Sequence, residues 1–207
     1  MKKLVGSLLA LGCALPLAAQ ADTYSFNALL SGANELPAGS GAPGTGLASL
    51  VYDTHGTAAF ADDTYNFTMS VFGLTGGSAP GAAANAFHLH GAATTAENGP
   101  VLISLDAAPF VSLNAGSTVL VGGADVPALM LAATPASGTN AGHPAMSFLA
   151  ALQAGLIYAN VHTALNPGGE VRGQLVEVAS VPEPATSAML LAGFAVIGAF
   201  IGRRRRG

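Results

Sequence analysis

The sequence predicts an all-β fold, an antiparallel Greek-key β-sandwich or barrel with one short helix, flanked by an N-terminal signal helix and a C-terminal transmembrane helix. Two observations in the middle of the chain carry this prediction. Apolar and polar residues alternate strictly along 24–30 and 65–71, which is typical of strands with one face on a core. Segments rich in glycine and proline separate many such short runs, as turns do in antiparallel sheets.

Further runs continue the strand pattern through the same region. We expect strands at 24–30, 47–52, 65–71, 86–90, 101–105, 119–121, 156–162 and 171–175. The segment 146–154 is rich in good helix formers and Gly155 follows it as a C-cap, so the short helix is expected there. By composition, 38–46, 76–84 and 134–144 are loops. These elements form one domain over residues 22–180.

The first residues have the layout of a secretory signal. Two lysines precede an apolar run, and the small-residue triplet Ala19-Gln20-Ala21 follows it. We therefore expect a signal peptide at 1–21 that is cleaved after Ala21. An uncleaved anchoring helix is the alternative, which the triplet and Pro16 near the end of the apolar run disfavour.

The last residues, 181–207, have the layout of a sorting tail. Pro182, Glu183 and Pro184 precede an uncharged span at 185–202, and four arginines follow it. Eighteen helical residues are about 27 Å long, enough to cross a bilayer with the arginines on the cytoplasmic side. The tail resembles the PEP-CTERM sorting signal, which implies export across the inner membrane, transient anchoring, processing by an exosortase, and a link to extracellular polysaccharide and biofilm. An ordinary tail anchor, kept in the membrane, is the alternative.

The charge of the central region excludes one class of function. Between residues 22 and 180 the chain has ten acidic residues and a single basic one, Arg172. Such a domain is repelled by phosphate backbones and has no basic patch to displace their counterions. Nucleic-acid binding is therefore excluded.

Three motifs along the domain resemble those of the CHRD family, named from chordin. They are SGANELP at 31–37, HLHG at 88–91 with GPV at 99–101, and YANVHT at 158–163 with NPGGEVRGQ at 166–174. They come in the family's order and cover nearly all of residues 24–176. The resemblance implies an extracellular β-sandwich without an established catalytic activity. The stretch between 105 and 146 is longer than the family usually has.

Three histidines in these motifs are candidate metal ligands. His88 and His90 are two apart on one expected strand, so both imidazoles leave the face opposite to Phe87. His162 lies on another strand, and copper or zinc can use such a set. The alternative is a hydrogen-bonded histidine network without metal that fixes the turn at Gly91 and the closing hairpin.

The order of these residues also resembles the layout of copper/zinc superoxide dismutases. That resemblance implies His88, His90 and His162 as copper ligands and Arg172 as a guide for the substrate anion. The histidine cluster for the zinc site and the disulfide of that family are missing from this sequence. For Arg172 the alternative is a structural ion pair with Glu170, or with Glu35 or Asp53.

Two hypotheses of function follow. The first is an exported, transiently membrane-anchored envelope or matrix protein with a non-catalytic binding or structural role, since no nucleophile and base stand together in the sequence. Its expected partners are the secretion machinery, an exosortase-type enzyme, the membrane and extracellular polysaccharide. The second is a copper-binding protein, with redox activity like that of superoxide dismutase, at the three histidines.

Overall fold

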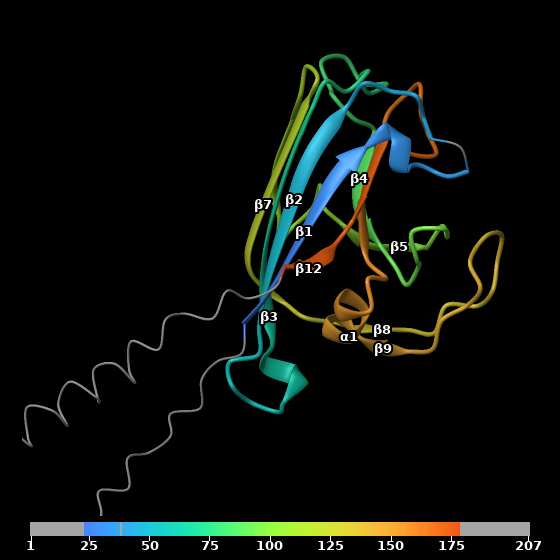
Figure 1. Cartoon of the computed structure of the whole chain (residues 1–207). Helices are drawn as coiled ribbons and strands as arrows, with labels where there is room; N and C mark the ends of the chain where they lie inside the picture. The colour runs from blue at the N-terminus through green and yellow to red at the C-terminus, as the bar shows by residue number, and fades with distance from the viewer. Residues whose placement is uncertain (1–22, 38, 179–207) are drawn as a thin grey trace, which may run out of the picture.

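The computed structural model describes residues 23–37 and 39–178, and its main element is one strongly curled antiparallel sheet (Figure 1). The ten strands follow the order β5-β4-β10-β11-β1-β2-β3-β7-β6, with β12 paired to β1. Their bounds are β1 Thr23–Ser31, β2 Thr45–Asp53, β3 Thr64–Phe72, β4 Ala86–His90, β5 Val101–Ser104, β6 Val111–Ala115, β7 Thr118–Pro127, β10 Tyr158–His162, β11 Val171–Gln174 and β12 Val176–Val178. The smaller elements are β8 Met130–Leu131, β9 Met146–Ser147, helix α1 Phe148–Gln153 and the 3-10 turns η1 Gly32–Asn34 and η2 Phe60–Asp62. The predicted all-β class with one short helix is confirmed.

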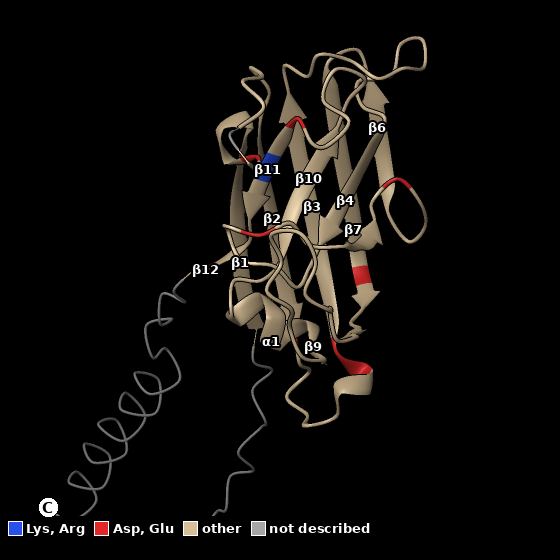
Figure 2. Ribbon diagram, turned by 90° about the vertical axis from the view of Figure 1, so that its right-hand side faces the viewer, with Lys and Arg blue, Asp and Glu red and all other residues tan. Residues whose placement is uncertain are grey.

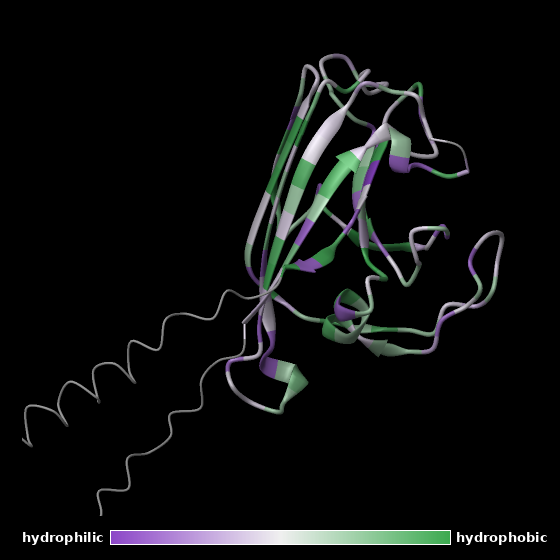
Figure 3. Ribbon diagram, in the orientation of Figure 1, coloured by the Kyte–Doolittle hydropathy of each residue, from purple (hydrophilic) through white to green (hydrophobic). Residues whose placement is uncertain are grey.

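The inner face of the curled sheet holds the core. Along β1 the even-numbered residues from Phe26 to Leu30 are buried, while their odd-numbered neighbours are exposed, as the alternation predicts. Figure 3 shows the same bands of differing hydropathy along β1 and β2. Phe67 of β3 and Phe87 of β4 belong to one buried cluster although several strands separate them in the sheet. The curl therefore brings distant strands around a common core.

Helix α1 closes one end of this core. Ser147 caps it by accepting a hydrogen bond from the amide of Ala150, and Gly155, at a φ of +65°, donates to the carbonyl of Leu152. The predicted helix and its C-terminal glycine are thus confirmed. Phe148 is fully buried, and its ring centroid lies 5.1 Å from that of Tyr65.

The long stretch between 105 and 146 contains strands that the sequence pattern did not indicate. Strand β7 has ten residues where only 119–121 was expected, because Gly122 and Gly123 interrupt the alternation of side chains. A Cβ on Gly123 would lie 2.6 Å from the ring of Phe110, so the glycine lets that ring pack against the strand. Strand β6 pairs with β7 at the edge of the sheet and exposes Val111 and Leu113.

The expected signal peptide at 1–21 and the expected tail at 181–207 lie outside the described residues. Within the described part of the chain, no helix is both long and apolar enough to span a membrane.

Candidate metal site

Strands β4, β10 and β11 place their polar residues on the sheet face opposite to the core. Asn160 pairs with His88 on one side and with Arg172 on the other, and Tyr158 pairs with His90 and Gln174 in the next row. Side chains alternate along a strand, so these residues share one face. The intervening residues, such as Leu89 and Val161, are buried in the core. The motifs at 88–91 and 158–163 therefore build a polar face together.

The three candidate histidines meet on this face. The ring centroids of His88 and His162 lie 5.4 Å apart, and those of His88 and His90 lie 5.6 Å apart. One nitrogen of each ring lies within 4.8 Å of the others, so a common centre exists within about 2.8 Å of all three (4.8 Å divided by √3). Bonds from zinc to imidazole are about 2.0–2.1 Å long, so each nitrogen has to approach by less than about 1 Å. The residues present thus fit a three-imidazole metal site.

Backbone carbonyls fix the orientation of two of these rings. His90 Nδ1 lies 3.0 Å from the carbonyl oxygen of Gly99, and His162 Nδ1 lies 3.0 Å from that of Pro167. A carbonyl only accepts, so both Nδ1 atoms carry the hydrogen and both Nε2 atoms keep a lone pair. These two Nε2 atoms and Nδ1 of His88 are buried without a hydrogen-bond partner. A lone pair held in this way by a bond at the other ring nitrogen is typical of histidine metal ligands.

Burial keeps the imidazoles in the neutral form that binds metal. It lowers the pKa of His90 to about 4, and the nearby His162 adds to this effect. The pKa values of His88 and His162 are also lowered, in both cases mainly by burial. A metal ion therefore meets little competition from protons at neutral pH.

Glu35 and Asn160 extend the polar face beside the histidines. Burial raises the pKa of Glu35 to about 7, while the charge of Arg172 and a hydrogen bond from Asn160 act in the opposite direction. One oxygen of each of these two side chains is buried without a partner. Among the residues that the structure describes, every buried side-chain nitrogen or oxygen atom without a partner belongs to Glu35, Asn160 or the three histidines. In the described part of the chain, the buried side-chain atoms without a partner thus all belong to this face and to Glu35 beside it.

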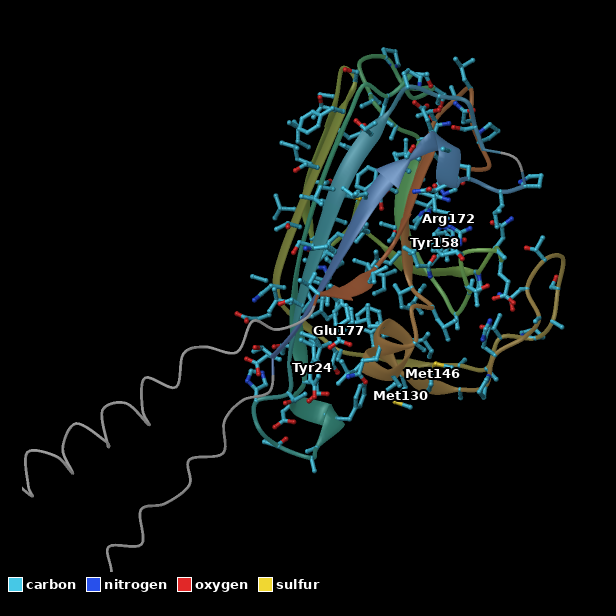
Figure 4. The ribbon with its side chains drawn as sticks, in the orientation of Figure 1. Tyr24, Met130, Met146, Tyr158, Arg172 and Glu177 are labelled. Carbon is cyan, nitrogen blue, oxygen red and sulfur yellow. The ribbon has the colours of Figure 1, made fainter. Side chains whose placement is uncertain are left out.

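Arg172 is the only Lys or Arg in the described part of the chain (Figure 2). Its side chain lies beside that of Tyr158 (Figure 4). Its guanidinium carbon lies 3.5 Å from the ring centroid of Tyr158, and that ring lies parallel to His90 with centroids 4.9 Å apart. The guanidinium donates to the side chain of Asn98 and to the carbonyl of Thr94, and the residue is 2% exposed. Arg172 therefore supports the site from behind Tyr158.

Glu170, the expected partner of Arg172, has other contacts. Its carboxylate accepts hydrogen bonds from the amide of Thr75 and from the hydroxyls of Thr75 and Thr163. No salt bridge joins Glu170 to Arg172 in the part of the chain that the structure describes. The reason is local: Glu170 precedes β11, next to Gly169 at a φ of +138°, so the alternation of the strand does not set its direction.

The sequence reasoning did not assign Asn160 or Tyr158 to the site, and it named Glu35 only as a partner of Arg172. All three residues lie in the motifs at 31–37 and 158–163. Residues 158, 160 and 162 alternate along one strand, so their side chains share one face of the sheet. This spacing is the sequence signal that places Tyr158 and Asn160 beside His162.

Comparisons with known proteins agree with this architecture. A family model of the CHRD domain matches residues 26–175, and a model of the PEP-CTERM protein-sorting motif matches residues 180–206. No curated protein and no solved structure matches the chain. The sorting motif implies export, anchoring in the membrane at the C-terminus, and processing by an exosortase. The chain therefore belongs to the CHRD-domain family and carries a PEP-CTERM sorting motif at its C-terminus.

Proposed function

We propose that this exported protein binds a transition-metal ion, copper in the first place, through His88, His90 and His162. Two observations carry the proposal together: one ring nitrogen of each histidine lies within 4.8 Å of the others, and each ring has a buried nitrogen without a hydrogen-bond partner. Three imidazoles suit copper and zinc, and a given site generally binds copper(II) more tightly than zinc. The three imidazoles would each donate a lone pair to the ion, while the carbonyls of Gly99 and Pro167 hold the opposite nitrogens of His90 and His162.

The second observation favours metal binding over a purely structural histidine network. In such a network each ring nitrogen has a protein partner, since burying an unpaired polar group costs about 1–3 kcal/mol. Here one nitrogen of every ring lacks a partner.

The contacts of Arg172 favour binding over dismutase-like turnover. As a guide for substrate anions, its guanidinium has to face the metal and the solvent. Instead, the residue is buried behind Tyr158 and donates to the 92–99 loop. A domain with ten acids and one base also steers anions away. We therefore assign a binding role and name no catalytic residue.

The setting that we propose for this activity is the cell envelope. The signal peptide at 1–21, cleaved after Ala21, delivers the chain, and the tail at 181–207 holds it in the membrane until processing at Pro182, Glu183 and Pro184. Release to the cell surface then brings it next to extracellular polysaccharide. The match to the PEP-CTERM motif supports this part of the proposal.

The experiment is metal analysis of the full chain, purified in detergent without chelator and then titrated with copper(II). The test variant is His88→Ala/His90→Ala, and the matched control is His55→Ala, since His55 is an exposed histidine outside the site. We expect one tightly held equivalent in the wild type and the control and none in the double variant. No tight binding in the wild type, or equal binding in all three, would overturn the proposal.

A further inference from the structure

The loop 92–99, between β4 and β5, lies against the candidate metal site. Its Gly99 carbonyl accepts from His90 Nδ1, and the amide of the same residue donates to the hydroxyl of Tyr158. Two other loop residues, Thr94 and Asn98, accept from the guanidinium of Arg172. The position of this loop therefore sets the orientation of His90 and of the stack behind it.

A hairpin from the long stretch after β5 fastens this loop. Its two arms, 134–137 and 140–143, are joined by backbone bridges, Thr134 with His143 and Ser137 with Asn140. The side-chain amide nitrogen of Asn140 donates to the carbonyls of Ala92 and Asn98, at 2.9 and 3.2 Å. The hairpin therefore holds both ends of the loop 92–99.

The carboxylate of Glu97 lies at the centre of the contact between the loop 92–99 and the hairpin 134–143. One oxygen accepts from the amide of Ala141 at 2.9 Å, and the other accepts from the amide of Thr94 at 2.7 Å and lies 2.9 Å from Nε2 of His143. These hydrogen bonds lower the pKa of Glu97 to about 2, although the residue is only 7% exposed. The carboxylate thus stays charged and is bonded to both the loop and the hairpin.

We propose that Glu97 is a positioning residue for the metal site, acting through the loop 92–99 and the Gly99 carbonyl on His90. The inference rests on the metal-binding function proposed above. Carbonyl and carboxylate partners of a metal-ligating histidine fix its tautomer and ring direction, and their loss typically costs 10- to 100-fold in metal affinity. Glu97 does not contact His90 itself. It holds the loop 92–99, which carries the Gly99 carbonyl that accepts from His90.

The test compares Glu97→Gln with the wild type in the full chain, with copper(II) as the probe. We expect the dissociation constant for copper to rise by about 10-fold, towards the lower end of the outer-shell range. The electron paramagnetic resonance spectrum of the bound copper should change as well, because His90 turns. His143→Gln keeps a donor near the position of Nε2, so it should retain the affinity of the wild type, whereas His143→Leu should not.

Two controls separate positioning from general stability. Glu177→Gln removes an exposed acid on β12 and should leave both the affinity and the spectrum unchanged. Met69→Ala opens the core in β3, away from the site, and should lower the thermal midpoint without altering the copper spectrum. If Glu97→Gln does not fold, His143→Leu replaces it as the test variant, because it removes one of the three contacts of the carboxylate. We expect the same rise in the dissociation constant for copper and the same change of the spectrum.

The outcomes are distinct. If the wild type binds copper and Glu97→Gln has the same affinity and spectrum, or loses no more affinity than Met69→Ala does, the positioning role is wrong while the metal site stands. If the wild type itself binds no copper, the proposed function fails, and the role of Glu97 at the site fails with it.

Discussion

Acidification of the metal-free protein should destabilise it through His90. Burial lowers the pKa of this histidine from the ordinary value of 6.5 to about 4. Between these values the unfolded chain binds a proton that the folded state does not. The contribution of His90 to the free energy of unfolding is therefore complete above pH 6.5 and is lost as the pH falls towards 4. The difference between the two pKa values corresponds to about 3 kcal/mol of unfolding free energy.

Glu35 acts in the opposite sense and has to be separated from His90. Burial raises its pKa from 4.5 to about 7, so its stabilising contribution is complete below pH 4.5 and is lost as the pH rises through 7. The variant His90→Asn removes the titration of the histidine and leaves Glu35 in place. An asparagine amide also keeps a donor for the Gly99 carbonyl.

The assay is urea unfolding of the chelator-treated full chain and of His90→Asn between about pH 7 and about pH 4. We expect the wild type to lose about 3 kcal/mol more than the variant over this range. Parallel curves for the two proteins would refute the reasoning, because they would mean that the folded state protonates His90 as readily as the unfolded chain does.

Three further substitutions test the packing around the site and the core. Glu170→Gln turns an amide toward groups that donate to the carboxylate, so we expect a loss of about 2–4 kcal/mol in urea unfolding with copper binding unchanged. Gly169→Ala places a Cβ 2.6 Å from the carboxylate of Glu35 at a φ of +138°, and should lower stability by at least about 2 kcal/mol. Phe148→Ala removes a buried ring beside Tyr65 and should cost about 3–5 kcal/mol, measured by the same unfolding assay. For each variant, an unfolding curve identical to that of the wild type would contradict the packing described.

The sequence predicted the strands whose apolar residues contact the core and missed β6 and β12, which are exposed along most of their length. β1 and β3 alternate because one face lies on the core, so their pattern is visible without a structure. β6 and β12 are exposed, and only pairing with a neighbouring strand makes them strands. Pairing depends on residues far away in the chain, and a local pattern does not carry that information.

The same limit applies to the candidate site. The two-residue spacing of His88 and His90 predicted one face for both, and the structure brings His162, which the sequence also named as a candidate, to their side. The site neighbours of Arg172 were not predictable in this way, since the loop that accepts its hydrogen bonds is about 75 residues earlier in the chain. Strand alternation also gives no direction for the side chain of Glu170, because β11 begins only at the next residue.

The cost of the polar face is itself an argument that it has a ligand. An unpartnered buried polar group costs about 1–3 kcal/mol, so three such nitrogens cost about 3–9 kcal/mol against a typical domain stability of about 5–15 kcal/mol. Asn160, opposite His88 on the neighbouring strand, does not remove this cost, since one oxygen of its side chain is itself buried without a partner. A metal ion satisfies all three at once, and the acidic surface of the domain attracts cations toward it. This cost supports the proposal that His88, His90 and His162 hold a cation.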